Sequence, residues 1–397
     1  MKKTLSVGLV VLFLLTSGSA LASALSKPVQ VGPKAIGMGG AFVGIADDPT
    51  AIYHNTAGMT QLTGHTVEVG MDSLITNEEY TPPTTGVVEN AKREFLPVPQ
   101  FGYVSAGFKP FYWGLGVFFP HGNGGKFSAA SAILTNPTEG RIYSMEIDPA
   151  VAFELMKGLS VGGSLRIVRL SSTLKNALFQ VGAQVDTLEN LTVTGWGVGG
   201  SFGVLYKPMD WLSFGVNWRS KVTPALDGDA KFTGLGTLAA SFEEPLPMLV
   251  TAGFGFKPME NLTLGLSYDF EANSEIKTLN VALAGVGTIP LDENYSDSHT
   301  IHVGAEFWAM PAFAMRAGWA KDLNDSIPDD MMNRIVGDIA AHEVSFGLAF
   351  KVKALTLEGT WNARFGSRTI PVTATNLAPG YYNAFVQMVS LGAKLAI

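Results

Sequence analysis

An alternating pattern of large apolar and small or polar residues recurs along the chain, and it constrains the fold more than any other feature. The pattern is clearest at residues 159–165, 212–218 and 262–268, and looser copies begin at Phe313 and Leu355. Side chains of a β-strand point alternately to opposite faces, so this period of two is typical of strands between an apolar and a polar environment. We therefore predict an all-β protein.

The composition favours strands that cross a membrane. Charged residues make up 15% of the chain and hydrophobic residues 47%, whereas soluble domains carry about 25% charged residues. No stretch after residue 24 approaches the run of about 18 apolar residues that indicates a membrane-spanning helix. The apolar residues are dispersed among polar ones, as in a barrel whose strands have one lipid-facing side. The net charge of −7 is mild and offers no footprint for nucleic acid.

Short turns and longer segments alternate along the sequence. Six short turns are predicted, near Lys109, Lys157, Pro208, Pro258, Pro311 and Lys353. Seven longer polar or glycine-rich segments are predicted as loops, at about residues 77–97, 120–139, 176–191, 224–246, 275–297, 322–340 and 367–384. Outer-membrane barrels have short turns in the periplasm and longer loops outside the cell. Seven loops, each joining two strands, predict a fourteen-stranded antiparallel transmembrane β-barrel. Residues 229–242 are assigned to a loop, because one extra strand would put the chain ends on opposite sides.

The alternation also predicts which side chains face the lumen. Along one strand, the residues predicted to face lipid are Leu262, Leu264, Leu266, Tyr268 and Phe270. A charge that faces lipid at mid-bilayer costs about 2–4 kcal/mol, so charged strand residues are predicted to point inward. They are Glu68, Arg166, Arg219, Glu306, Arg316 and Glu358. These side chains are interpreted as a solvated or ion-paired lumen wall. The alternative is that Arg166, Arg219 or Arg316 binds the head group of a ligand.

The first 24 residues are typical of a secretory signal peptide. Lys2 and Lys3 form a basic start, residues 5–15 are almost wholly apolar, and small residues at 20–24 fit a cleavage site. The apolar run is shorter than the roughly 20 residues of a membrane anchor. We expect residues 1–24 to be removed and the mature chain to fold in the outer membrane of a Gram-negative bacterium.

Residues 25–62 do not alternate, and they are predicted to fold apart from the strands. The segment is compact, glycine-rich and barely charged. Asp48 followed by Pro49 favours a helix start, with Asp48 as N-cap and Pro49 at the first helical position. Because a folded segment precedes a barrel wide enough to hold it, we interpret residues 25–62 as a hatch inside the lumen and residues 63–397 as the barrel.

The predicted hatch carries a resemblance to a known family. The residues that carry it are Gly37, Gly39, Gly40, Asp47, Asp48, Pro49, Asn55, Thr56 and Ala57, and the similarity continues through residues 119–122. Here the chain resembles the FadL family of outer-membrane transporters of long-chain fatty acids and hydrocarbons. The resemblance implies a fourteen-stranded barrel closed by an N-terminal hatch, passive uptake of hydrophobic substrates, and a bent third strand that opens the wall sideways. The chain departs from the family at Thr56, where Pro is usual, and at Ile397, where an aromatic residue is common.

The third predicted strand, at about residues 111–120, is the candidate for a sideways opening. Pro120 cannot donate a ladder hydrogen bond, and the nearby glycines allow the backbone to bend. The candidate residues are Gly114, Gly116, Phe119, Pro120 and Gly122. The alternative is that Pro120 only ends the strand before a loop.

No catalytic or metal-binding pattern stands out in the sequence. The six histidines are scattered, and His299 and His302 are three residues apart, so they point to opposite faces of a strand. We therefore expect no enzyme activity, no metal and no cofactor. We expect a monomer whose partners are outer-membrane lipid and hydrophobic small molecules, without nucleic acid.

Two functions remain open at this point. The first is a passive channel that captures fatty acids or hydrocarbons at its outer loops, holds them in an apolar pocket above the hatch and releases them sideways. The second is a general or structural porin without hydrophobic selectivity. The predicted hatch and the apolar runs at residues 128–134 and 279–286 favour the first, because apolar surface at the outer rim offers a landing site for hydrophobic ligands.

Overall fold

The helices of the protein are few and short. The computed structural model describes residues 30–127, 139–181, 184–332, 338–373 and 379–397, so the predicted signal peptide and the apolar run 128–134 lie outside the described residues. The described helices are α2 (Pro33–Gly37), α3 (Ala51–His54) and the 3-10 helices η1 (Thr56–Gln61) and η2 (Asn273–Glu275). None of these helices is long and apolar enough to cross a membrane.

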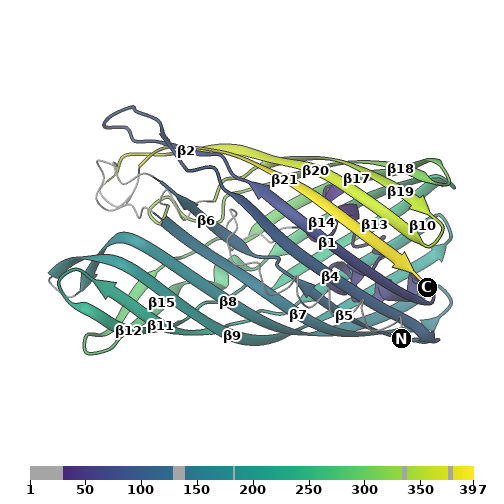
Figure 1. Ribbon diagram of the computed structural model, residues 1–397, viewed down its shortest axis with the longest axis horizontal. Helices are drawn as coiled ribbons and strands as arrows, with labels where there is room; N and C mark the ends of the chain where they lie inside the picture. The colour runs from purple at the N-terminus through teal and green to yellow at the C-terminus, as the bar shows by residue number, and fades with distance from the viewer. Residues whose placement is uncertain (1–29, 128–138, 182–183, 333–337, 374–378) are drawn as a thin grey trace, which may run out of the picture.

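The strands form one closed antiparallel sheet (Figure 1). They are β1 (His65–Ile75), β2 (Glu78–Thr81), β3 (Glu89–Asn90), β4 (Phe95–Phe108), β5 (Phe111–Phe118), β6 (Gly122–Lys126), β7 (Glu139–Met156), β8 (Leu159–Val181), β9 (Gln184–Met209), β10 (Leu212–Arg219), β11 (Ala225–Phe232), β12 (Gly236–Glu243), β13 (Leu249–Met259), β14 (Leu262–Glu271), β15 (Thr278–Leu283), β16 (Gly287–Asp292), β17 (Ser298–Met310), β18 (Phe313–Asp322), β19 (His342–Val352), β20 (Leu355–Ile370) and β21 (Gly380–Ala396). Strand β1 pairs with β4 on one side and with β21 on the other. The first and last strands therefore close a barrel.

The barrel wall has fourteen transmembrane strands when interrupted strands are counted once, as the sequence predicted. We call each of these fourteen wall positions a stave. Some staves are two strands in succession, separated by a short interruption: β1 and β2, β3 and β4, β5 and β6, β10 and β11, β12 and β13, β14 and β15, and β16 and β17. Short turns, such as residues 109–110 and 157–158, join neighbouring staves at the end where the C-terminus lies (Figure 1).

Three segments that the sequence assigned to loops are largely strand. Residues 224–246 contain the hairpin of β11 and β12, residues 275–297 contain the hairpin of β15 and β16, and residues 176–191 continue β8 and β9. The prediction was wrong because the outward face of these extensions is charged, as at Asp227 and Asp229, and resembles a polar loop. The hairpins lengthen existing staves without adding one, so the count of fourteen holds. Strands β8, β9, β11 and β12 carry the wall far beyond the hatch (Figure 1).

The predicted faces of the strands are confirmed. On β14, Leu264 and Tyr268 are exposed on the outer surface, whereas Thr263, Ser267 and Glu271 are buried. The six charged residues predicted to face inward, from Glu68 to Glu358, are all buried.

The described part of the predicted hatch, residues 30–62, is packed inside the barrel (Figure 1). Helix α2 contacts β18 to β21, and η1 contacts β7, β8 and β9. Phe42, Ile52 and Met59 are fully buried in one apolar cluster with Val104 and Tyr112 of the barrel wall. We call residues 30–62 the hatch. The hatch is therefore held in the barrel by an apolar core that it shares with the wall.

The predicted helix start in the hatch is displaced by two residues. Helix α3 begins at Ala51, with Thr50 at its N-cap position. Asp48 Oδ1 instead accepts hydrogen bonds from the backbone N–H of Thr50 at 2.9 Å and from its hydroxyl at 2.6 Å. The carboxylate thus stabilises the turn before the helix, an arrangement common for Asp.

Candidate functional site: an outer apolar pocket, a hatch and a gap in the wall

A cluster of charges fixes the start of the hatch to the wall. Lys34 Nζ lies 2.9 Å from Glu306 Oε1 on β17 and 2.9 Å from Asp47 Oδ1. Arg316 on β18 donates to the same Glu306 at 2.7 Å and to Glu358 on β20 at 2.9 Å. Lys34 and both barrel carboxylates are buried, and removing one partner of a buried ion pair typically costs about 3–5 kcal/mol. This cluster is a strong attachment between hatch and barrel.

A second cluster lies beside the centre of the hatch. Arg166 Nη2 is 2.7 Å from Glu146 Oε1, and Arg219 pairs with the same carboxylate. Arg219 also donates to the backbone carbonyl of Tyr53 at 3.2 Å and lies 4.0 Å from the centre of its ring. The structure therefore brings Arg166 and Arg219 together and places Arg316 elsewhere. Each of the three contacts a carboxylate of this chain, and their binding of a ligand head group stays a prediction.

The motif residues of the hatch make its internal and wall contacts. Asn55 Nδ2 donates to the carbonyls of Val43 at 2.9 Å and of Val204 on β9 at 3.0 Å. The Thr56 hydroxyl lies 3.3 Å from the hydroxyl of Ser201 on β9, so a hydrogen bond to the wall is made where a proline would have none. Gly39 has a φ of 60°, and a Cβ there would lie 2.7 Å from the backbone N of Trp319.

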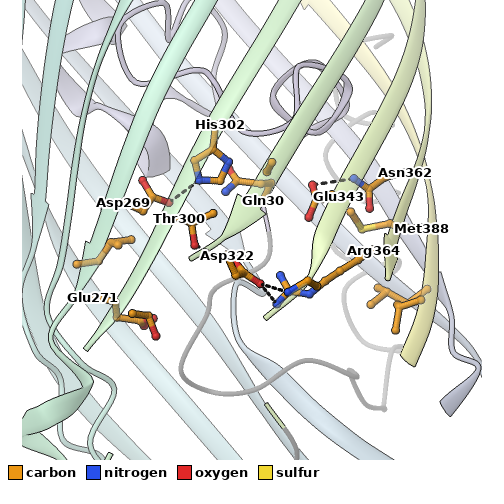
Figure 2. A pocket seen from close by; sticks show the side chains of 16 residues that line it. Gln30, Asp269, Glu271, Thr300, His302, Asp322, Glu343, Asn362, Arg364 and Met388 are labelled. Carbon is orange, nitrogen blue, oxygen red and sulfur yellow. Dashed lines mark hydrogen bonds and ion pairs between the residues drawn. The ribbon is translucent and has the colours of Figure 1, made fainter. Parts of the chain in front are cut away.

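A small polar chamber lies directly beside the hatch (Figure 2). It has a volume of about 70 Å³. His302 spans its edge, because one ring nitrogen lies 2.7 Å from the carbonyl oxygen of Gly39 in the hatch and the other 3.1 Å from Asp269. Asp322 accepts from Arg364 at 2.5 Å on the opposite side. Most of the residues that line this chamber are charged or hydrogen-bonding, so it is not the apolar pocket predicted above the hatch.

The apolar pocket lies farther out, between the strand extensions. Its volume is about 260 Å³, and the inward faces of β7 to β9, β11, β12, β15 and β16 line it. The apolar lining residues on these strands are Ile142, Leu174, Leu188, Leu191, Ala230, Phe232, Phe242, Leu279, Val281, Leu283 and Leu291, and Ile327 lines the pocket from the segment after β18. A dry cavity of about 150 Å³ with such a lining binds benzene. The pocket therefore has room for a small aromatic molecule or for part of an alkyl chain.

Two acidic residues stand at the polar end of this pocket. Glu244 follows β12 and Glu293 follows β16, and both line the pocket with Tyr295. Burial raises the pKa of Glu293 to about 7. The pKa of Glu244 is raised as well, mainly by burial and secondarily by the negative charge of the neighbouring Glu293. Below its pKa a carboxyl is neutral, so at mildly acidic pH this end of the pocket offers hydrogen-bond donors without charge.

Ligand affinity of the pocket is expected to depend on pH. A neutral apolar ligand excludes water from both carboxyls and favours their uncharged form, so affinity for such a ligand should fall as the pH rises through about 7. Titration calorimetry between pH 6 and 8.5 measures this, and E293Q should flatten the profile. Equal affinity across the range in the unsubstituted protein would contradict the assignment.

The wall between the second and third staves is interrupted. Strands β4 and β5 pair continuously from Ser105 with Trp113 to Phe101 with Val117. If this register is continued along both strands, the next pairing is the isolated bridge between Ala91 and Phe127. Between these two points the described residues of β4 and of the stretch leading into β6 form no ladder with one another. Apolar side chains gather at this place: Leu96, Val98, Phe119 and Tyr143 belong to one cluster. We call this interruption the wall gap.

Prolines on both sides account for the wall gap. Ala106 of β4 donates its N–H toward β1, to Gly64, and the β1–β4 register is regular. Odd-numbered residues of β4 therefore point their backbone groups toward β5, and at Pro97 and Pro99 no N–H is available there. On the other side, residues 119–121 with Pro120 separate β5 from β6. Pro120 was among the residues predicted at the opening, whereas Pro97 and Pro99 were not.

Two of the glycines predicted at the sideways opening lie beside the hatch. Gly114 and Gly116 lie in the regularly paired part of β5, opposite Val104 and Gly102. A Cβ on Gly114 would lie 2.9 Å from the Ile52 side chain of the hatch. These glycines thus make room for the hatch, and the interruption between β5 and β6 lies at residues 119–121. Gly122 begins β6 after that interruption.

The chain shares its fold and much of its sequence pattern with a known family of proteins. It matches the family described as outer membrane protein transport protein (OMPP1/FadL/TodX) over residues 13–359, which is most of its length. The chain belongs to this family. No curated protein sequence matches it significantly. As a member of the OMPP1/FadL/TodX family, the protein is an outer-membrane channel for hydrophobic compounds and not an enzyme.

Solved structures show the same fold at low sequence identity. A FadL homologue of Pseudomonas aeruginosa is 17% identical with a TM-score of 0.81, covering 94% of this chain and 99% of that one. The toluene transporter TbuX of Ralstonia pickettii is 17% identical with a TM-score of 0.73 (92% and 98% covered). The toluene transporter TodX of P. putida is 15% identical with a TM-score of 0.76 (92% and 98% covered).

Proposed function

We propose that this FadL-family channel takes up small hydrophobic molecules by holding them in the outer apolar pocket and releasing them sideways through the wall gap. The observation that carries the proposal is the pocket itself. Eleven apolar side chains from separate strand extensions converge on one volume of about 260 Å³, and mostly apolar, concave sites with few polar groups are typical of ligand binding.

The chemistry of the pocket favours neutral ligands over carboxylates. Its polar end carries Glu244 and Glu293, and an ionised carboxylate ligand placed there would meet like charge. The basic side chain in the lining, Arg141, already pairs with Glu94. Hydrocarbons, and alcohols or acids in their uncharged form, are therefore the proposed cargo. The names of the similar structures, which include toluene transporters, agree with this class.

The pocket and the wall gap share a strand. Gly124 of β6 lines the pocket, and the stretch leading into β6 forms one border of the wall gap. A ligand that leaves the pocket along β6 meets the apolar cluster of Leu96, Val98 and Phe119, whereas the route straight down meets the polar chamber and the hatch. The sideways route is the apolar one, and it needs no energy source beyond the concentration gradient.

Filling the pocket is expected to abolish uptake. Ala230 on β11 is buried and lines the pocket, and its neighbour Asp229 faces outward. A230W should lower toluene affinity by about tenfold or more, at least ~1.4 kcal/mol, and reduce uptake by cells in parallel. D229W adds the same side chain to the outer face and should change neither. Normal uptake by a correctly folded A230W protein would contradict the proposal.

A further inference from the structure

A second interruption of the wall lies at the outer hairpins. Strands β12 and β15 pair only at Ala240–Leu283 and Ser241–Ala282, and the N–H of Ala284 adds a bond of 2.9 Å to the carbonyl of Ala239. The next contact along these staves is the bond of 2.9 Å from the N–H of Ala272 to the carbonyl of Met248. Between these points, residues 242–247 and 273–281 are described and form no ladder with each other. We call this interruption the notch.

The notch opens outward into a groove of about 720 Å³. Its lining is mostly polar and includes Lys221, Asp227, Glu243, Glu275, Thr278 and Asn280. Lys221 and Glu275 form an ion pair of 3.4 Å across its lower rim. These side chains lie at outward-facing positions of the strands or in the segments that connect two strands. The groove therefore belongs to the outer surface of the barrel.

The groove and the apolar pocket lie back to back. Phe242 and Leu279 line both the outer groove and the inner pocket. Phe242 is buried and Leu279 partly buried, and no strand pairing ties the two segments together at this level. These two apolar side chains therefore form part of the partition between a polar outer groove and an apolar inner pocket.

The outer surface of this stave changes from apolar to polar where the groove begins. On β10 the exposed outer residues are Phe214, Val216 and Trp218, which form part of the lipid-facing band. Beyond Trp218 the outward positions become polar, with Asp227 and Asp229 on β11. Tryptophan marks the membrane interface in outer-membrane barrels. The groove begins just beyond that boundary.

We propose that the notch is a side entrance for amphipathic molecules, such as long-chain alcohols, that are already inserted in the outer leaflet. The polar end is held first among the polar groups of the groove at head-group level, while the apolar tail passes between Phe242 and Leu279 into the pocket. The polar end then follows, so the groove is a passage and not part of the final binding site. This entrance rests on the proposed function of the pocket, because it delivers cargo there. It differs from the wall gap, which lies between other staves.

Blocking the groove tests the entrance. The chain contains no cysteine, so single cysteines at Asn280 or Ser241 in the groove can be labelled with a bulky maleimide. A cysteine at Asp229, outward on β11 and outside the groove lining, is the matched control. The measurements are uptake of radiolabelled dodecanol by cells and equilibrium binding of dodecanol to the purified protein in detergent.

Labelled N280C and S241C are expected to take up dodecanol several-fold more slowly than the same unlabelled proteins, with unchanged equilibrium affinity in detergent. Labelled D229C should be unaffected. F242A, which thins the partition, should speed uptake. Undiminished uptake by fully labelled N280C and S241C would overturn the entrance. Failure of the unlabelled, folded protein to bind or take up dodecanol would instead overturn the proposed function, so the two failures are distinguishable.

Discussion

Deleting residues 30–62 is expected to convert a closed barrel into a conducting pore. The hatch fills the lumen with buried residues of α2, α3 and η1, and a barrel of this size encloses a wide lumen once its plug is absent. Single-channel recordings in planar bilayers should show a large, steady conductance for the deletion and little for the full chain. Equal conductance of the two proteins would show that the hatch does not close the pore.

A single substitution in the hatch tests whether its attachment to the wall can be weakened without removing it from the pore. K34M keeps the hatch but removes the lysine partner of Glu306 and Asp47. Arg316 still pairs with Glu306, so we expect a loss of stability below the ~3–5 kcal/mol of a fully uncompensated buried charge. We expect brief openings and a lower unfolding temperature of the hatch, without the steady conductance of the deletion. T60V is the control: it removes an uncharged hydroxyl that makes hydrogen bonds of 2.9 Å to the carbonyl of Ala57 and 2.8 Å to Ser160, and it should change little.

Cross-linking the wall gap is expected to stop delivery while leaving capture intact. The pairs Phe101–Val117 and Ala91–Phe127 belong to one continuous register. In that register Pro99 lies opposite Phe119. P99C/F119C joined by a short bis-maleimide should bind toluene as before, because the pocket is untouched. Uptake should fall by about tenfold or more, ~1.4 kcal/mol in the barrier. Reversal with a cleavable reagent would show that the link itself is responsible.

The matched control joins two residues that already pair. Tyr103 and Leu115 face each other in the intact part of the same ladder, so linked Y103C/L115C should transport normally. Full uptake by a verified cross-linked P99C/F119C protein would contradict the sideways exit and favour a route past the hatch.

Much of the fold could be predicted from local patterns. The period of two at residues 262–270 identified the lipid-facing side of β14, because a strand between lipid and lumen alternates by geometry alone. Glycine, aspartate and proline in the hatch motif indicated a compact segment, although Asp48 stabilises a turn where a helix cap was expected. Such boundaries depend on a few hydrogen bonds that neighbouring residues can redistribute.

The site was less accessible to sequence reasoning, since it depends on residues that only the closed barrel brings together. Leu188, Phe232 and Val281 come from separate strands and form one pocket, and no local pattern contains that convergence. The charged outward face of β11 made its hairpin resemble a loop and concealed its apolar inner face. A usable signal was present at the wall gap, where Pro97 and Pro99 remove donors from an otherwise regular strand.

The central claim is that the channel passes hydrophobic molecules and excludes hydrophilic ones. Its most direct test compares uptake of toluene and of a sugar of similar size by cells that lack other large porins, with and without this protein. We predict that the protein speeds toluene uptake strongly, leaves sugar uptake at background, and loses the toluene effect in A230W. Sugar uptake that rises as much as toluene uptake would show a general porin and contradict the account.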